Sequence, residues 1–120
     1  MSQTKSQLLS KLSQNPSSVE FAEVIDVINA TYHYTPSSFS NGLGENKVLN
    51  ESSINEGSCR IFAFAQLNKL TEEQTLQCFG DYYRKAVLAN PEAHDHANIR
   101  TFMCYGWAGI VFDQVVLIEK

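Results

Sequence analysis

Cys59 is the residue best placed for covalent chemistry, because it follows a polar Asn-Glu-Gly-Ser stretch, residues 55–58, at the start of a helix-like run. The positive end of a helix lowers the pKa of a nearby thiol and makes it a better nucleophile. With His96 as the base and Asp95 or Asn98 as the group that orients it, Cys59 would complete the catalytic set of a thiol hydrolase or transferase.

The alternative for Cys59 is a packed, unreactive thiol. Free cysteine is among the most buried residue types, and Cys59 shares one face of the helix-like run with Phe62 and Ala63. We favour this interpretation and expect an interaction or small-ligand-binding domain without catalysis. An enzyme would need Cys59 ionised, open to solvent and within hydrogen-bond reach of His96.

A second group of polar residues suggests binding. Its members are Asn55, Glu56, Ser58, Arg84, Asp95, His96, Asn98 and Arg100. We expect residues 55–58 and 95–100 to meet at a helix N-terminus, because their donors and acceptors are complementary. Backbone N–H groups, arginines and a histidine would then suit an anion or a carboxamide. The alternative is a hydrogen-bonded clamp that is closed to solvent.

Two further side-chain groups have a structural interpretation. His94 and His96 lie two residues apart, which places them on different sides of a helix, so we expect no metal and no other cofactor. Arg84 follows two tyrosines and is expected to pair with Glu56 or Asp81, which would hold the two segments in register.

The run from residue 55 to 70 is the element that must position these groups. Its apolar residues recur at helical spacing and also occupy the other sides: Cys59, Ile61, Phe62, Ala63, Phe64, Ala65, Leu67 and Leu70. A helix that is apolar on nearly every side lies inside a packed domain. We therefore predict that Cys59, Phe62 and Phe64 lie in the core, and that Gly57 lets another group approach closely.

Other elements are indicated by capping residues and by periodicity. Ser17 or Ser18 is expected to cap a helix that runs to about residue 32, followed by a strand over residues 31–36 and a brief returning strand over 47–49. The capping-box pattern of residues 71–74 opens a helix that carries Leu76, Phe79, Tyr83 and Val87 on one face.

Near the C-terminal end, Asp95 is expected to cap a last helix that stops at Gly106, and residues 107–112 and 115–118 are expected to form a hairpin. The fold class is therefore α+β, a mainly helical single domain of about four to five helices. Its small antiparallel sheet would combine the Tyr32 strand with the C-terminal hairpin.

The start of the chain differs in composition from the rest. Residues 1–15 are rich in serine, contain no acidic residue and carry one short stripe, Leu8, Leu9 and Leu12. We expect an amphipathic helix that packs weakly and is dispensable for folding, ahead of a single domain over 16–120. An export segment is the alternative for the same composition.

Length and charge exclude several classes of protein. A chain of 120 residues fits one domain with a real core. Its net charge of −4 and scattered basic residues argue against nucleic acid, and no apolar run approaches the roughly 20 residues of a membrane helix. Three cysteines in apolar surroundings, without paired spacing, indicate reduced thiols and no disulfide.

Four stretches together resemble the HopJ type III effector family. They are Phe21-Ala-Glu-Val-Ile25 running on to Tyr32-x-Tyr34-x-Pro36-x-x-Phe39-x-Asn41-Gly42; residues 55–59 with Ile61-Phe62; residues 75–84; and residues 95–100 with Phe102-Met103, Gly106-Trp107 and Gly109-Ile110. The resemblance implies a soluble bacterial domain and no particular reaction. It implies the bacterial cytoplasm, or secretion by a type III system into a host cell. The partner would be an unknown protein or a small anionic ligand.

Overall fold

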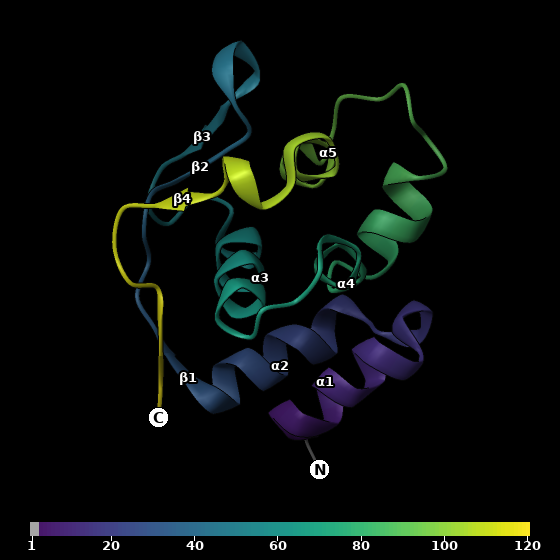
Figure 1. The fold of residues 1–120 in the computed structure, drawn as a ribbon, viewed down its shortest axis with the longest axis vertical. Helices are drawn as coiled ribbons and strands as arrows, with labels where there is room; N and C mark the ends of the chain where they lie inside the picture. Colours follow the sequence, from purple (N-terminus) through teal and green to yellow (C-terminus); the bar gives the residue numbers. More distant parts are fainter. Residues whose placement is uncertain (1–2) are drawn as a thin grey trace.

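The computed structural model describes residues 3–120, in which short strands lie along one side of a group of helices (Figure 1). The α-helices are α1 (Lys5–Gln14), α2 (Phe21–Thr31), α3 (Glu56–Leu67), α4 (Glu72–Gln77) and α5 (Ala97–Tyr105). The strands are β1 (Tyr32–Tyr34), β2 (Phe39–Asn41), β3 (Val48–Asn50), β4 (Val111–Phe112) and β5 (Leu117–Glu119). Shorter helical turns are η1 (Pro16–Ser18), η2 (Gly44–Asn46), the π-helix η3 (Tyr82–Val87) and η4 (Gly106–Gly109). The α+β, mainly helical fold class is confirmed.

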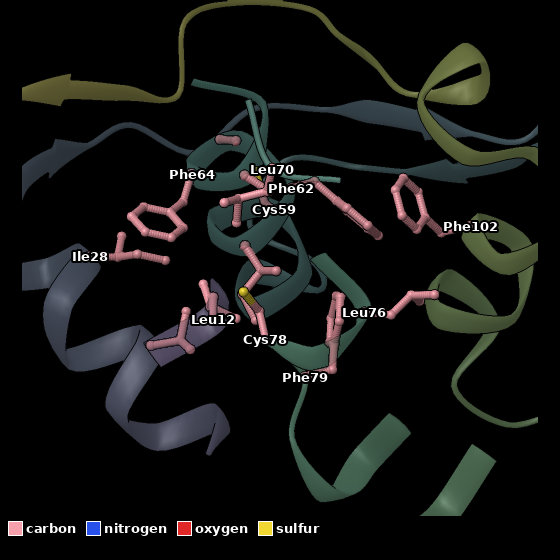
Figure 2. Close-up of a cluster of buried hydrophobic side chains, with 14 of the residues drawn as sticks. Leu12, Ile28, Cys59, Phe62, Phe64, Leu70, Leu76, Cys78, Phe79 and Phe102 are labelled. Carbon is pink, nitrogen blue, oxygen red and sulfur yellow. The ribbon is translucent and has the colours of Figure 1, made fainter. Parts of the chain in front are cut away.

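Helix α3 lies at the centre of the domain, as its all-round apolar sequence predicts (Figures 1 and 2). Cys59, Phe62 and Phe64 are all buried, which confirms their predicted place in the core. The Phe62 ring contacts the rings of Phe79 and Phe102 at centroid distances of 5.4 and 5.0 Å. Side chains from α1, α2, α4 and α5 thus converge on α3 and form one core.

Helix α1 belongs to this core, so the expectation that the N-terminal segment packs weakly is wrong. Leu8 and Leu12 are 0% and 1% exposed. Lys11 forms an ion pair with Glu23 of α2 at 2.9 Å, and Thr4 caps the helix by accepting a hydrogen bond from the Gln7 N–H. The leucine stripe is short, but α1 contacts α2, α4 and the turn η1, so Leu8 and Leu12 are enclosed. Met1 and Ser2 lie outside the described residues.

The strands form two antiparallel sheets rather than one. Strand β5 pairs with β1, whereas β4 pairs with β2, which also pairs with β3. The predicted C-terminal hairpin is therefore wrong: residues 107–109 belong to the helical turn η4, and the two strands that do form, β4 and β5, pair with different sheets. The connecting segment is fixed instead to residues 37–38: the Asp113 N–H donates to the Ser38 carbonyl, and the Gln114 N–H donates to the Ser37 hydroxyl. These bonds direct the chain from one sheet to the other.

Several helix starts differ from the sequence expectation. Helix α2 is capped at Glu20, whose N–H donates to Glu23, because Pro16 places both candidate serines in the turn η1. The N-cap of α5 is His96, one residue after the predicted Asp95, and the helix does end at Gly106. The capping box at the start of α4 is confirmed, with the Gln74 N–H donating to Thr71.

The predicted long helix after Thr71 is interrupted at Gly80. Gly80 has a φ of +60°, and a Cβ there would lie 2.7 Å from the Phe21 nitrogen, so only glycine fits between the two segments. The chain continues as the π-helix η3. Within residues 3–120, none of the helices has the length and apolar character needed to cross a bilayer.

Candidate functional site

The Cys59 thiol has the surroundings of a packed core residue. It is 1% exposed and donates a weak hydrogen bond to the Ser37 carbonyl at 3.8 Å. Burial raises the pKa of Cys59 and outweighs the groups that favour the thiolate. His96 lies against other residues, with its ring 5.6 Å from that of Tyr82 and Nε2 3.9 Å from the Asp95 carboxylate. This geometry does not provide a thiolate paired with a base.

Glu56 faces β1 and not residues 95–100. Its carboxylate accepts a hydrogen bond of 3.1 Å from the Tyr34 hydroxyl. The Arg60 guanidinium carbon lies 3.9 Å from the centroid of the Tyr34 ring, and burial raises the pKa of that tyrosine. Sequence reasoning missed Arg60, although a Glu and an Arg four residues apart on one helix are expected to be neighbours. Ser58 is half-buried in the first turn of α3.

Four asparagines, three of them buried, form a hydrogen-bond network at the junction of α3, α5 and the three-stranded sheet. Asn98 accepts from Asn41 at 3.1 Å and from Asn50 at 3.0 Å, and it donates to the Asn50 side-chain oxygen at 2.9 Å. Asn55 donates to the same oxygen at 2.7 Å. Asn41, Asn50 and Asn98 are all buried. Residues 55–58 and 95–100 are therefore joined through the buried side chain of Asn50, with Asn55 at the exposed end of the network.

This asparagine network has the geometry of the clamp that was the alternative to an open site. Asn55 has a left-handed backbone conformation, with φ at 56°, which asparagine tolerates better than most residues. Its side chain reaches Asn50 instead of capping α3. Sequence reasoning missed Asn41 and Asn50, because an asparagine in a short strand reads as a turn residue when its burial is not known.

Both predicted site arginines bind acceptors of the protein itself. Arg84 donates to the Val19 carbonyl and to the Gln77 side chain, and it lies 3.9 Å from Asp81. Arg100 donates to the Asp95 carboxylate and to the Asn90 carbonyl, both at 2.8 Å. The hydrogen bond from Arg100 lowers the pKa of Asp95. Arg84 thus packs near the start of α2 and Arg100 on α5, so the two guanidinium groups do not converge on one anion.

An open groove lies beside the residues that sequence analysis singled out. It has a volume of about 580 Å³ between the start of α2 and the π-helix η3, and it is lined by Glu20, Phe21, Ala22, Asp81, Tyr82, Lys85 and Ala86. The Phe21 and Tyr82 rings meet edge to face at 5.2 Å, and Tyr82 contacts His96. A Cβ at Gly57 would lie 2.9 Å from the Phe21 ring, which confirms the predicted close approach at Gly57.

A row of aromatic rings therefore connects the two polar stretches along this groove. It runs from Gly57 through Phe21 and Tyr82 to His96. Sequence reasoning did not assign Phe21 or Tyr82 to a site: Phe21 belongs to the apolar face of its helix, and Tyr82, which lies off the apolar face that carries Tyr83, gives no local sign of the ring that it meets. In residues 3–120, no three histidine, cysteine, aspartate or glutamate side chains gather closely enough to hold a metal ion.

These features define a small, mainly helical α+β domain with a buried asparagine clamp and an open aromatic groove. The chain belongs to the HopJ type III effector protein family, whose model matches residues 5–117. It is also similar to a solved crystal structure described as that of the unknown function protein VPA0580. The two are 44% identical, with a TM-score of 0.94, over 100% of this chain and 97% of that chain. No match was found among curated proteins.

Proposed function

We propose that this protein is a binding domain without catalysis of its own, and that it engages a partner protein through the groove between α2 and η3. The observation that carries this proposal is the exposed aromatic side chain of Tyr82, which is 49% exposed in a groove of about 580 Å³. Pockets of roughly 300–1,000 Å³ with apolar walls and a few polar groups are typical of ligand sites.

The charges around the groove indicate the chemistry of its partner. Glu20 and Asp81 supply two carboxylates, and Lys85 supplies one ammonium group that lies 3.6 Å from Asp81. The walls between them are Phe21 and Tyr82. A matching segment would therefore present an aromatic or aliphatic side chain next to a lysine or arginine, so that the ring fills the groove and the cation meets the carboxylates.

The π-helix supports this assignment to the groove. Within η3, Tyr83 is buried and its hydroxyl donates to Glu73, whereas the adjacent Tyr82 faces the groove. A π-helical turn changes the direction of successive side chains relative to an α-helix, and such turns occur frequently at functional sites. Here the turn holds one tyrosine in the core and leaves the next one free to contact a partner.

A pair of short peptides tests the proposed chemistry. We would titrate ¹⁵N-labelled protein with acetyl-Lys-Phe-Lys-amide and follow backbone amide shifts by NMR, with acetyl-Glu-Phe-Glu-amide and acetyl-Lys-Ala-Lys-amide as controls. The Lys-Phe-Lys peptide should shift amides of residues 20–22 and 81–86, with a dissociation constant on the order of 1 mM. Equal binding of the Glu-Phe-Glu peptide, or shifts only elsewhere, would contradict the proposal.

We propose further that the chain is exported by a type III system and that residues 1–15 carry the export information. Their serine-rich, acid-free composition supports this idea. Because Leu8 and Leu12 are core residues, α1 must leave the domain before the segment can be recognised. Fusion of residues 1–15 to a reporter in a bacterium with an active type III system should cause secretion of that reporter. Retention of the reporter inside the cell would contradict export through this segment.

A further inference from the structure

Strand β5 has one open edge. In the β1–β5 pair, the Thr35 N–H donates to the Val116 carbonyl at 2.8 Å, and the Lys120 N–H donates to the Thr31 carbonyl at 3.0 Å. Backbone groups alternate between the two edges of an antiparallel strand, so residues 116, 118 and 120 bond to β1. The N–H and C=O groups of Leu117 and Glu119 point away from β1. Within residues 3–120, no strand pairs with this second edge.

A second groove runs beside β5, on the side of α3 that does not contact β1. Helix α3 contacts β1 through Phe64, whose ring lies 6.1 Å from that of Tyr32, and through Arg60 above Tyr34. The groove has a volume of about 240 Å³ and is lined by Ala63, Gln66, Leu67, Phe112, Gln114, Val115, Val116 and Leu117. This groove therefore lies between helix α3, which forms one wall, and the chain that leads into β5, which forms the other.

This region is apolar and carries no charge. All eight lining side chains are uncharged, although the chain has a net charge of −4. Leu67 of α3 and Val115, two residues before β5, are 55% and 68% exposed, and Ile118 of β5 is 59% exposed. Natural proteins usually protect an unpaired strand edge with charged residues, bulges or a covering element, and the centre of an interface is poor in charged residues. Uncovered apolar side chains beside an open edge thus indicate an interface.

We propose that a second copy of this chain occupies this edge, with the β5 strands of the two copies paired antiparallel about a two-fold axis. With the axis at Leu117, that residue lies opposite the partner's Leu117, and Val115 lies opposite the partner's Glu119. The backbone groups of Leu117 and Glu119 face outward, so the central pair of Leu117 residues can exchange both hydrogen bonds, and Glu119 offers its N–H and C=O to the segment at the partner's Val115, just before β5. The result is a four-stranded sheet in the order β1, β5, the partner's β5, the partner's β1.

The charges fit such a two-fold pairing. Glu119 is the charged residue of the paired segment 115–119, and the two copies of it lie at opposite ends of the ladder. Like charges therefore do not face each other, which would destabilise a strand pair. The pairing also brings Val115 and Leu67 of each copy to the interface, so their apolar area leaves solvent.

The oligomeric state in solution tests the proposal, with two valines as a matched pair. Val115, beside β5, and Val111, in β4 of the other sheet, are both exposed, at 68% and 58%. Light scattering and sedimentation of the full chain at roughly 10–200 μM should give about twice the monomer mass of 13.5 kDa. Val115→Lys should raise the dimer dissociation constant at least tenfold, because it places two charges in the interface. Val111→Lys should leave the constant unchanged.

Circular dichroism shows that each variant is folded before its mass is compared. A wild-type monomer at every concentration would overturn the proposal. A Val115→Lys protein that remains as dimeric as the wild type would also overturn it, and so would equal dissociation of the two variants, which would place the contact elsewhere. Dissociation confined to Val115→Lys would support the β5 pairing.

Discussion

Replacing Asn98 with alanine should destabilise the domain strongly, because Asn98 is the centre of the buried asparagine network. Its side chain makes three hydrogen bonds, two accepted from Asn41 and Asn50 and one donated to Asn50. Each such bond contributes about 1 kcal/mol, and a buried donor left without a partner costs about 1–3 kcal/mol. In Asn98→Ala the side-chain amide of Asn50 is a buried donor without a partner, whereas the Asn41 amide keeps its hydrogen bond to the backbone carbonyl of residue 98. Together, the three lost bonds and the unpaired donor predict a loss of about 4–6 kcal/mol.

The assay is urea denaturation, with the free energy of unfolding of Asn98→Ala compared with that of the wild type. Asn46 provides the matched control: it makes one side-chain hydrogen bond, to Tyr105 at 2.8 Å, but is exposed. Asn46→Ala should cost about 0.5 kcal/mol or less, as is usual for a surface substitution. If Asn98→Ala lost no more than Asn46→Ala, the network would not join α3 and α5 to the sheet in the way that we describe.

Three further outcomes are expected. A thiol reagent should modify Cys104 alone in the native protein and all three cysteines after unfolding. The reason is that Cys59 is buried and that burial raises the pKa of Cys78 to about 12. Rapid modification of more than one thiol in the native protein would contradict this prediction. Leu12→Ala should cost about 2–5 kcal/mol in a urea melt, whereas a loss below about 0.5 kcal/mol would place α1 outside the core. Burial alone would raise the pKa of Glu23, but hydrogen bonds from Lys11, the Glu20 backbone and Gln3 lower that pKa below its ordinary 4.5. The stability that the Glu23 carboxylate contributes is therefore fully present above pH 4.5 and is lost as the pH falls through the lowered pKa. Thermal melts should therefore show a smaller loss on acidification for Glu23→Gln than for the wild type, and equal losses would contradict this.

The elements that the sequence predicted well are those with strong local signals. The all-round apolar pattern of residues 55–70 and the capping box at Thr71 each depend on neighbours within one helix, so periodicity and capping are sufficient to identify them. The predicted C-terminal hairpin failed because strand partners are chosen by tertiary contacts. The local sequence of residues 107–118 does not indicate that the backbone N–H groups of Asp113 and Gln114 donate hydrogen bonds to residues 37–38.

The N-terminal helix shows the limit of counting apolar residues. A stripe of three leucines predicts little burial by itself, but the structure places Leu8 and Leu12 against neighbouring helices that the local sequence does not specify. The interruption of the predicted helix at Gly80 also depends on a distant residue. Glycine is required there because the backbone of Phe21, 59 residues earlier in the chain, approaches closely.

The candidate site was predicted in part. Polar residues at the starts of two helices were identified, and the structure joins Asn55 and Asn98 through Asn50, which a single sequence could not supply. Glu56 and His96 contact different residues: Glu56 accepts a hydrogen bond from Tyr34, and the His96 ring lies against that of Tyr82. The groove itself depends on Phe21 of α2 and Tyr82 of η3, which meet only in the tertiary structure, so local periodicity does not indicate it.

The affinity of the Lys-Phe-Lys peptide for a groove variant tests the central claim most directly. Tyr82→Ala removes the exposed ring, while Tyr105→Ala removes a tyrosine on α5 that does not line the groove. If the groove between α2 and η3 is the binding site, Tyr82→Ala should weaken peptide binding at least tenfold, because a buried aromatic contact contributes about 1.4 kcal/mol or more, and Tyr105→Ala should bind like the wild type. Equal affinity of all three proteins would contradict the account.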